Sequence, residues 1–264
     1  MKGFQTLVPQ DSAAAKQVLL GIWISAFDLP TAVAQMAEAV IAGRRCYVST
    51  CPVYTLMQGH ERPDVRAALN GADWVTPDGM PVVWALRALG AGGVGRVYGP
   101  DLMLALSELS AARGYRQFYV GGAPGVADEL GRVLAARFPG LSVAGAVAPP
   151  FRPLTAAERG ALVAQINAAQ PHIVWVGLGS PKQDLWMAEF RPDLAAPLLV
   201  GVGAAFDFLT GRQRQAPRWA QRSGLEWLFR LLSDPGRLWR RYMIYNPRFI
   251  LQLALQLTGL RRYP

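Results

Sequence analysis

Three glycine-rich segments stand where the ligand-binding turns of an α/β protein are expected. Each follows an apolar run rich in β-branched and aromatic residues, and they span residues 118–125, 174–183 and 199–207. In open parallel sheets, ligands bind beyond the carboxyl ends of the strands, where glycine lets the backbone approach and helix N-termini offer N–H groups to phosphate. None of the segments completes Gly-x-Gly-x-x-Gly or a P-loop, which disfavours a dinucleotide-dependent oxidoreductase.

The second segment carries a lysine at an unusual place. Pro181 is expected to begin a helix with Ser180 as its N-cap, which puts Lys182 and Gln183 in the first helical turn. A cation is unfavourable at the positive end of a helix unless an anion binds there. The chain has only three lysines, so Lys182 does not belong to a general lysine-coated surface. We interpret Lys182 as a diphosphate contact, and the alternative is a solvated side chain.

Three carboxylates of the chain stand beside predicted strand ends or turns. Asp101 follows a Gly-Pro turn and is favoured as a helix N-cap, whereas Asp78 precedes Gly79 and fits either an N-cap or a ligand contact. Asp207 ends the third glycine-rich segment. The sequence contains no Asp-x-Asp, so a metal clamp on a sugar diphosphate is not evident and cationic side chains would have to take that role.

Other common chemistries find little support in the residue types and their spacing. His60 falls in a polar turn and His172 begins a strand, so no hydrolase triad or metal-binding histidine pair is indicated. Cys46 and Cys51 have no second cysteine pair beside them, which predicts two small buried thiols of a reduced protein and neither a disulfide nor a zinc site.

Short strands that alternate with longer helices must position these groups. The predicted strands cover residues 18–27, 46–50, 74–76, 117–120, 141–146, 172–176 and 198–202. The predicted helices cover residues 31–42, 53–59, 63–69, 80–89, 101–113, 124–137, 155–169 and 181–190. Such alternation is typical of an α/β, Rossmann-like fold, with a mostly parallel sheet and helices on both faces.

The positive charge of the chain is confined to its C-terminal fifth. Of 264 residues, 27 are Lys or Arg and 18 are Asp or Glu, a net charge of +9. Residues 212–264 contain eleven Arg and two acids, so this segment alone carries +9 and residues 1–211 are neutral. We call residues 1–211 the body and residues 212–264 the tail, and we predict that they are an α/β catalytic domain and a helical appendage.

The tail is predicted to form three helices, over residues 225–232, 238–245 and 249–260, with Pro217, Pro235 and Pro247 near helix starts. Its arginines interleave with tryptophan, tyrosine and phenylalanine, which is typical of helices that lie on an anionic membrane surface. An alternative is that the helices pack back on the body with solvated arginines. Nucleic acid binding is disfavoured because no recognition motif is present.

The N-terminus and the hydropathy of the chain indicate a cytoplasmic protein. The first ten residues contain no apolar region of the kind that signal peptides need. No window of about 18 uncharged apolar residues occurs, so no membrane-spanning helix is expected.

The ordered motifs resemble those of the WecG/TagA/CpsF glycosyltransferases, glycosyltransferase family 26, over nearly the whole chain. The matching stretches are Pro-Asp78-Gly79, Arg96-Val-x-Gly99-Pro-Asp101-Leu-Met103, Gly121-Gly122, Gly177-Leu-Gly179-Ser-Pro-Lys182-Gln183, Gly201-Val-Gly203-Ala-x-Phe-Asp207, Arg214-Gln-Ala-Pro217 and Gly224-Leu-Glu226-Trp227-Leu-x-Arg230-Leu. Many motifs in this order at compatible spacing make the resemblance specific, whereas one of them alone would not.

The resemblance implies an inverting, metal-independent enzyme with no cofactor, located at the cytoplasmic face of the membrane as a peripheral protein. Such enzymes move a sugar from a nucleotide sugar, typically a UDP-sugar, onto a polyprenyl-diphosphate-linked monosaccharide in surface polysaccharide or exopolysaccharide biosynthesis. Their basic C-terminal appendage is thought to dock on the membrane and to complete the active site.

The motifs assign residues to three tasks. The resemblance implies Asp78 as general base, with Thr50 and Arg96 beside it. For the nucleotide sugar, the glycine-rich segments and the matched motifs together indicate Gly79, Gly121, Gly122, Gly177, Gly179, Lys182, Gln183 and Asp207. For the membrane and the substrate diphosphates, the tail offers Arg214, Arg218, Arg222, Arg230, Arg237, Arg240 and Arg241.

One departure from the family pattern affects the choice of sugar. Many members read Thr-x-Asn after the strand that ends near Thr50, whereas this chain reads Thr50-Cys51-Pro52. A glucosyl donor is therefore as consistent with the sequence as N-acetylmannosamine. A non-catalytic peripheral membrane protein that binds lipid-linked sugar stays open as the alternative function.

Overall fold

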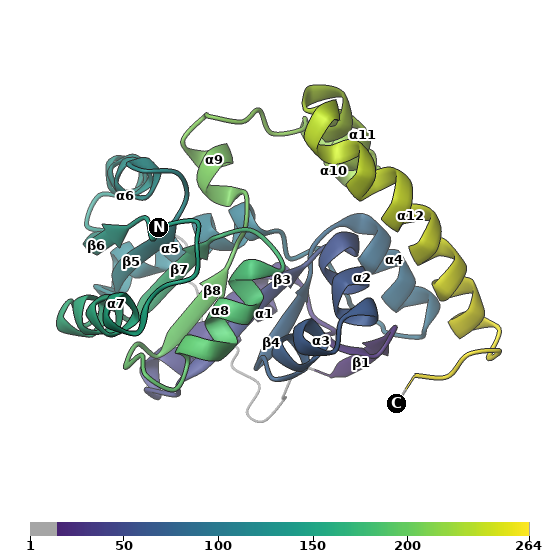
Figure 1. Cartoon of the computed structure of the whole chain (residues 1–264), viewed down its shortest axis with the longest axis horizontal. Helices are drawn as coiled ribbons and strands as arrows, with labels where there is room; N and C mark the ends of the chain where they lie inside the picture. The colour runs from purple at the N-terminus through teal and green to yellow at the C-terminus, as the bar shows by residue number, and fades with distance from the viewer. Residues whose placement is uncertain (1–14, 264) are drawn as a thin grey trace, which may run out of the picture.

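The computed structural model describes residues 15–263, and Figure 1 shows the chain in this form. The predicted absence of a signal peptide concerns residues 1–10, which lie outside the described residues. The elements of the body alternate between strand and helix from residue 46 to residue 209, as the sequence predicts.

A parallel sheet of six strands forms the centre of the body. Its order is β4-β3-β8-β7-β5-β6, and every neighbouring pair is parallel. The strands are β3 (Cys46–Cys51), β4 (Trp74–Pro77), β5 (Arg116–Gly121), β6 (Ser142–Val147), β7 (Ile173–Gly177) and β8 (Leu198–Gly201). The predicted Rossmann-like α/β fold is confirmed, and all six carboxyl ends meet at one edge of the sheet.

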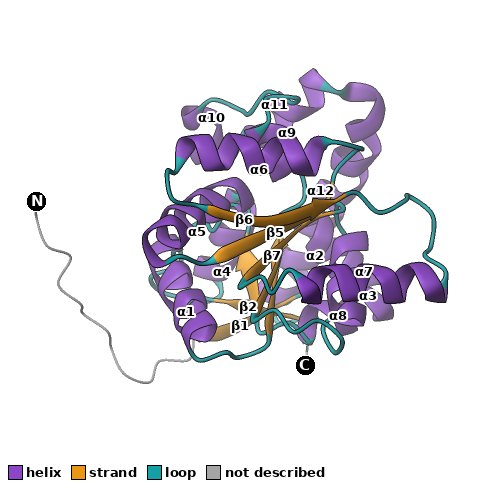
Figure 2. Cartoon of the chain, turned by 90° about the vertical axis from the view of Figure 1, so that its left-hand side faces the viewer, coloured by secondary structure: helices purple, strands orange, loops and turns teal. Residues whose placement is uncertain are grey.

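Helices cover both faces of this sheet, as Figure 2 shows. The helices of the body are α1 (Leu29–Ile41), α2 (Val53–Glu61), α3 (Pro63–Asn70), α4 (Met80–Ala88), α5 (Gly99–Arg113), α6 (Val126–Arg137), α7 (Ala156–Ala168), α8 (Lys182–Phe190) and α9 (Ala205–Leu209). Helices α2, α3, α4, α7 and α8 contribute to one hydrophobic core, and α1, α5, α6 and α9 contribute to the other.

The period of two along each strand divides its side chains between these cores. In β7, Val174 and Val176 belong to one core, whereas Ile173 and Trp175 belong to the other. All four side chains are fully buried. Because both faces of β7 are covered, its sequence is a continuous apolar run without alternation of polar and apolar residues.

The apolar run 18–27, predicted as one strand, is instead an antiparallel hairpin. Strands β1 (Lys16–Leu19) and β2 (Ile22–Ser25) pair through a two-residue turn in which Leu20 and Gly21 both have positive φ. Tight hairpin turns need such angles, which glycine adopts freely and leucine does not. The turn is held from outside, because the Gln256 side chain accepts a hydrogen bond from the Leu20 N–H at 3.0 Å and donates one to the Val18 carbonyl at 2.9 Å.

The tail forms two short helices and one long helix that lies along α2. They are α10 (Arg218–Arg222), α11 (Glu226–Ser233) and α12 (Pro235–Leu257). The predicted helix break at Pro247 is wrong, because α12 continues through it. A proline inside a helix removes one backbone hydrogen bond. On the body side, Leu238, Tyr242 and Phe249 are buried on both sides of Pro247, which holds the helix in one piece.

One face of the tail therefore packs on the body, which is the arrangement that the sequence left open as the alternative to membrane docking. The Tyr245 ring meets the Tyr54 ring of α2 edge-on, with 5.1 Å between centroids, and Arg248 forms an ion pair with Glu61 at 3.1 Å. Other apolar side chains of the tail are exposed, among them Trp239, Ile250 and Leu251.

Gly121→Ala is predicted to destabilise the protein, because Gly121 closes the end of β5 against β7 in a conformation that only glycine tolerates. Its φ is +123°, and a Cβ there would lie 2.6 Å from the carbonyl carbon and oxygen of Gly177. We expect the free energy of unfolding to fall by about 3 kcal/mol in denaturant titrations.

The matched control is Gly160→Ala in the exposed middle of α7, where a Cβ would meet nothing within 4 Å. This change should raise the free energy of unfolding by about 0.5–1 kcal/mol, because alanine is the better helix former. Equal stability of the two variants would contradict the assigned packing.

Candidate active site

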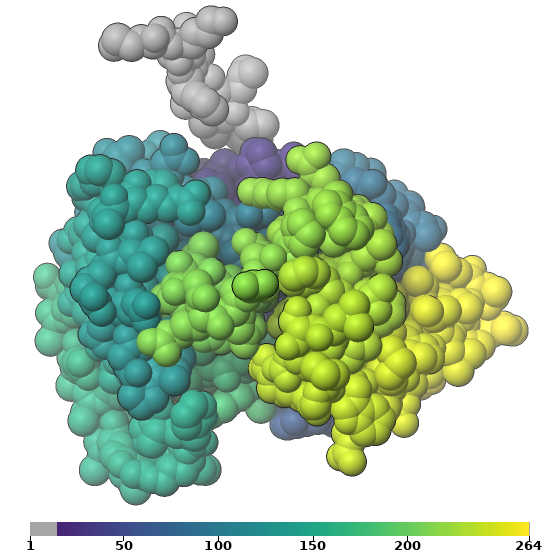
Figure 3. Space-filling model, turned by 90° about the horizontal axis from the view of Figure 1, so that it is seen from above, coloured from purple at the N-terminus to yellow at the C-terminus, as the bar shows by residue number. Residues whose placement is uncertain are grey.

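A cavity of about 700 Å³, counting the space open to solvent, lies between the body and the tail at the carboxyl end of β4. Its walls are Pro52, Val53, Tyr54, Asp78, Gly79, Met80, Pro81, Arg96, Tyr98, Gln221, Gly224, Glu226, Trp227, Arg230, Arg241, Tyr242 and Asn246. Viewed from above in Figure 3, the yellow-green tail occupies one side of the molecule and teal segments of the body occupy the other. Residues from both parts of the chain are therefore needed to enclose the cavity.

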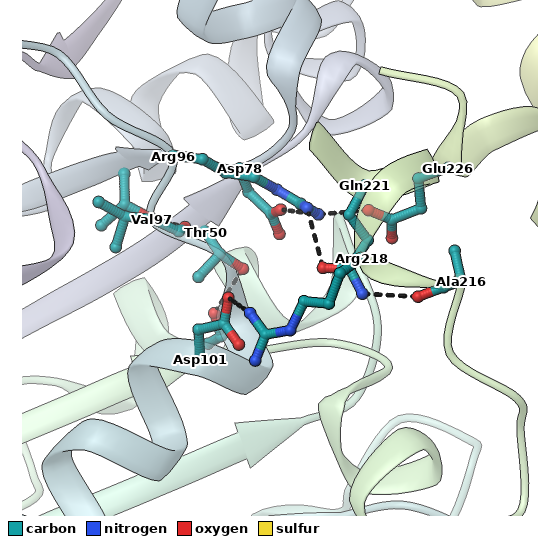
Figure 4. Close-up of polar contacts among 11 residues, drawn as sticks. Thr50, Asp78, Arg96, Val97, Asp101, Ala216, Arg218, Gln221 and Glu226 are labelled. Carbon is teal, nitrogen blue, oxygen red and sulfur yellow. Dashed lines mark hydrogen bonds and ion pairs between the residues drawn. The ribbon is translucent and has the colours of Figure 1, made fainter. Parts of the chain in front are cut away.

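Asp78, Arg96 and Glu226 form a charged cluster inside the cavity. Asp78 follows β4 directly, Arg96 lies in the loop before α5, and Glu226 begins α11 of the tail. The Nη2 atom of Arg96 contacts Glu226 Oε2 directly and lies 3.8 Å from Asp78 Oδ1 (Figure 4). The three side chains are only 13–15% exposed, so solvent screens their charges weakly.

The pKa of Asp78 is raised to about 6. Burial is the main cause, because it penalises the charged form, and the nearby Glu226 carboxylate acts in the same direction. Arg96, Arg230 and Arg241 act in the opposite direction. A carboxyl group with a pKa of about 6 is mostly ionised at neutral pH and still basic enough to accept a proton, which suits a general base.

Two arginines of the tail face Asp78 across the cavity. The Arg241 guanidinium lies 4.3 Å from the centre of the Tyr54 ring, and burial lowers its pKa. Its buried Nε atom has no hydrogen-bond partner within residues 15–263. Arg230 lies 5.3 Å from the centre of the Phe208 ring. This arrangement offers two cationic groups to an anionic ligand.

Thr50 lies near these groups, but its hydroxyl is already used by the sheet. Thr50 is buried near the end of β3, and its Oγ1 donates a hydrogen bond to the Gly201 carbonyl of β8 at 2.8 Å. Thr50 is absent from the cavity wall, whereas Pro52 of the same segment is part of it.

Cys46 and Cys51 are both buried free thiols, as predicted.

The glycines predicted to bind the nucleotide sugar differ in their surroundings. Gly79 lines the cavity with a φ of +105°. A Cβ at Gly122 would meet Val126 at 2.8 Å and one at Gly177 would meet the Phe206 ring at 2.8 Å, so both are packed, as Gly121 is. Gly179 has a positive φ and open space around it. Close approach of a ligand is therefore sterically possible at Gly79 and Gly179.

Lys182 and Gln183 begin α8, but their side chains point to different surroundings. Lys182 is exposed, and its Nζ donates to the Phe151 carbonyl at 3.2 Å and lies 5.7 Å from the Phe151 ring. Gln183 is fully buried, and its Oε1 accepts a hydrogen bond from the Gly203 N–H at 2.9 Å. The Gln183 side chain thus lies beneath the open edge of the sheet and fixes the turn after β8.

Two predicted helix caps are wrong. Helix α8 begins after Pro181, which occupies the N-cap position, so Ser180 is not the cap. Helix α5 begins at Gly99 with Tyr98 as N-cap, so Asp101 lies in its first turn instead of capping it. The helix starts two residues earlier because Pro100 fits a first-turn position. Asp207 lies half-buried in the short helix α9, which follows β8, two strands from β4 in the sheet, and it does not line the cavity.

The remaining tail arginines lie on the surface. The exposed ones are Arg214, Arg218, Arg222, Arg237 and Arg240. Arg218 lies 3.8 Å from Asp101 near the cavity (Figure 4), whereas Arg237 pairs with Asp234 at 2.6 Å. Of the seven predicted arginines, only Arg230 and Arg241 line the cavity.

Sequence reasoning missed Glu226 and Gln221 as site residues. Gln221 of α10 accepts a hydrogen bond from Arg96 Nη1 at 3.3 Å, and its own amide donates to the Ala216 carbonyl at 2.7 Å. Glu226 offered one signal, because it is one of only two acids in a strongly basic segment. In the described part of the chain, no three His, Cys, Asp or Glu side chains gather as a candidate metal site.

The sequence model of the glycosyl transferase WecG/TagA/CpsF family matches residues 17–263. The matched range includes both the body and the tail, the two parts of the chain that line the cavity together.

Asp78→Asn is predicted to stabilise the fold at neutral pH. The folded protein holds the Asp78 proton up to about pH 6, whereas the unfolded chain loses it near the ordinary Asp pKa of about 4, so stability falls as pH rises through this window. In denaturant titrations at about pH 7.5, the variant should be more stable than wild type by about 3 kcal/mol, and the difference should vanish below about pH 4.

Asp64→Asn is the control, because Asp64 is exposed and its hydrogen bond with Arg62 lowers its pKa. It should change stability little and in the opposite direction. An Asp78→Asn variant that is less stable than wild type at neutral pH would contradict the assigned burial of this carboxyl.

Proposed function

We propose a reaction from one premise: the chain belongs to the WecG/TagA/CpsF family of glycosyl transferases, which act in cell-surface polysaccharide synthesis. The reaction is transfer of a glucose-type or N-acetylmannosamine-type sugar from a UDP-sugar to a polyprenyl-diphosphate-linked monosaccharide. The observation that carries it is the position of Asp78, a buried carboxyl in a cavity that also holds two tail arginines.

The proposed chemistry is a single displacement with inversion at the anomeric carbon. The acceptor hydroxyl oxygen attacks that carbon, its proton passes to the Asp78 carboxylate, and the bond from the anomeric carbon to the diphosphate oxygen breaks. UDP then leaves with the bonding electron pair. A pKa of about 6 for Asp78 supports this role, because the carboxylate is present at neutral pH and accepts a proton more readily than an exposed Asp does.

Cationic side chains are proposed to neutralise the departing diphosphate, and no metal ion is invoked. Arg230 and Arg241 line the same cavity as Asp78, and the Arg241 Nε lacks a hydrogen-bond partner in the described chain, so it can donate to a phosphate oxygen. Donors fixed at the position where charge develops stabilise the transition state without reorganisation.

The nucleotide end of the donor is proposed to lie toward α8. Lys182 follows β7, three strands from β4, and strands about 4.8 Å apart place this helix start about 14 Å from Asp78. An extended sugar nucleotide covers such a span. The exposed Lys182 amine and the open space at Gly179 support this direction, since both can meet a diphosphate or ribose.

The tail is proposed to dock on an anionic membrane surface, where the lipid-linked acceptor resides, on the cytoplasmic side. Trp239, Met243, Ile250 and Leu257 recur at spacings of four and seven residues, so they form one exposed stripe along α12. Further exposed apolar side chains of the tail are Trp219, Leu225, Leu228, Leu232, Ile244, Leu251 and Leu260. None of the helices between residues 15 and 263 combines the length and apolarity that crossing a bilayer requires.

The second candidate function is a peripheral protein that holds lipid-linked sugar without transferring it. No separate observation favours this binding function, which would use the same cavity and the same tail surface as transfer. The two functions differ in one measurable product, because only transfer releases UDP when donor and acceptor are both present.

Asp78→Asn is predicted to lower kcat by a factor of about 10²–10⁴, since the amide cannot accept the acceptor proton. UDP release is measured over a panel of UDP-sugars, with and without a polyprenyl-diphosphate-linked sugar. The control Asp64→Asn changes an exposed carboxyl on α3 and should leave kcat unchanged. Near-wild-type turnover of Asp78→Asn would exclude the general-base role, and wild-type protein that releases no UDP with any donor would favour the binding function.

Ile250→Ala is predicted to weaken membrane binding by about tenfold, because three apolar carbons are removed from the surface that enters the interface. The measurement is flotation with vesicles that contain anionic lipid, and salt at about 1 M should also reduce binding by screening the arginines. Ile41→Ala on α1 is the matched control, since Ile41 and Ile250 are both 65% exposed. Equal loss in both variants, or binding that does not depend on anionic lipid, would refute docking through the tail.

A further inference from the structure

One nitrogen of Arg96 stands between two carboxylates and contacts only one of them. Its Nη2 atom touches Glu226 Oε2 directly, yet it lies 3.8 Å from Asp78 Oδ1, which is beyond hydrogen-bond distance. Arg96 and both acids are largely buried. The Arg96 guanidinium therefore lies closer to Glu226 of the tail than to Asp78.

The other contacts of Arg96 fix its guanidinium in the same place. Nη1 donates to the Gln221 side chain at 3.3 Å, and the guanidinium carbon lies 3.9 Å from the centre of the Tyr98 ring. Gln221 is itself held by its hydrogen bond to the Ala216 carbonyl. Both polar partners of Arg96 within hydrogen-bond distance, Gln221 and Glu226, thus come from the tail.

Removing the Glu226 charge would leave Arg96 with Asp78 as its nearest carboxylate. A buried cation without a partner is costly, so Arg96 would close the 3.8 Å gap and form a direct ion pair with Asp78. A carboxylate held in such a pair accepts a proton less readily, and its oxygen is no longer free for the acceptor hydroxyl.

We propose that Glu226 is a positioning residue for transfer: it engages Arg96 from the tail and thereby keeps the Asp78 carboxylate out of hydrogen-bond contact with Arg96 and available to the acceptor hydroxyl. Glu226 acts through Arg96, with no role in the bond-breaking step itself. This inference rests on the proposed function for the part that Asp78 plays, but the arrangement of the three side chains can be tested without any substrate.

The charged and titratable groups that face Asp78 come from every element around it. They are Cys51 of β3, Tyr54 of α2, Arg96 and Tyr98 of the loop before α5, Glu226 and Arg230 of α11, and Arg241 and Tyr242 of α12. Among them, Glu226 is the carboxylate that raises the pKa of Asp78 and also occupies Arg96. Replacing Glu226 by glutamine therefore lowers the pKa of Asp78 in two ways, by removing a negative charge and by freeing a positive one.

The test is the titration of Asp78 in the full chain. The carboxyl carbon signals of aspartate-labelled protein are monitored as the pH changes, and the signal of Asp78 is identified by its absence in Asp78→Asn. In Glu226→Gln, the midpoint of Asp78 should fall by about one unit from the wild-type value. Glu61→Gln is the matched control, because it removes another ion pair between tail and body, that of Glu61 with Arg248, and neither residue lines the cavity. Its midpoint should equal that of wild type.

Two results overturn the proposal: an unshifted midpoint in Glu226→Gln, or an equal shift in Glu61→Gln, which would assign the effect to tail attachment in general. If Glu226→Gln does not fold, Glu226→Asp carries the test, since it keeps the charge but shortens its reach. A midpoint of Glu226→Asp at or above wild type then overturns the proposal.

The pH dependence of transfer gives the second readout. In Glu226→Gln, the acid limb of kcat should move to lower pH while the plateau falls roughly threefold, because the base is weaker. A uniform loss with an unmoved acid limb would mean that Glu226 has only a structural role. If wild type transfers no sugar, the proposed function fails, and the titration still decides the arrangement of Glu226, Arg96 and Asp78.

Discussion

In the proposed role of general base, the carboxyl of Asp78 must be ionised to accept a proton, yet its burial opposes that charge, and the rest of the site follows from this conflict. Burial raises the pKa of Asp78, and the three arginines around it limit the rise. A site with only the burial would keep the carboxyl protonated, and a site with only the arginines would leave it a weak base. The value of about 6 requires both, so the cavity must be closed and positively charged at once.

The tail supplies most of what this balance needs. It closes the cavity over Asp78, contributes Arg230 and Arg241, and holds Arg96 through Gln221 and Glu226. Its attachment is secured at the far end of α12, where Gln256 bonds the turn of the β1–β2 hairpin. Because α12 also carries exposed apolar side chains, a membrane bound to them would contact the same helix that lines the cavity.

The sequence predicted the parts of the fold that depend on local periodicity. Alternating apolar strands and helices identified the sheet, and charge together with aromatic content marked the tail. The hairpin was missed because an unbroken apolar run hides a turn whose Leu20 takes a positive φ only under tertiary contacts. The continuity of α12 through Pro247 was missed for a similar reason, since its packing on α2 outweighs one lost hydrogen bond. Glu226 was missed because its contact with Arg96 spans 130 positions of the chain.

The central claim, that the buried Asp78 carboxylate is the proton acceptor for transfer, is tested most directly by the pH dependence of kcat/KM of the wild-type protein. This quantity reports the pKa of the essential base in the free enzyme. If Asp78 is this base, the profile has an acid limb with an apparent pKa of about 6, the value for Asp78 in the closed cavity. An acid limb at the ordinary Asp value of about 4, or no acid limb, would contradict it.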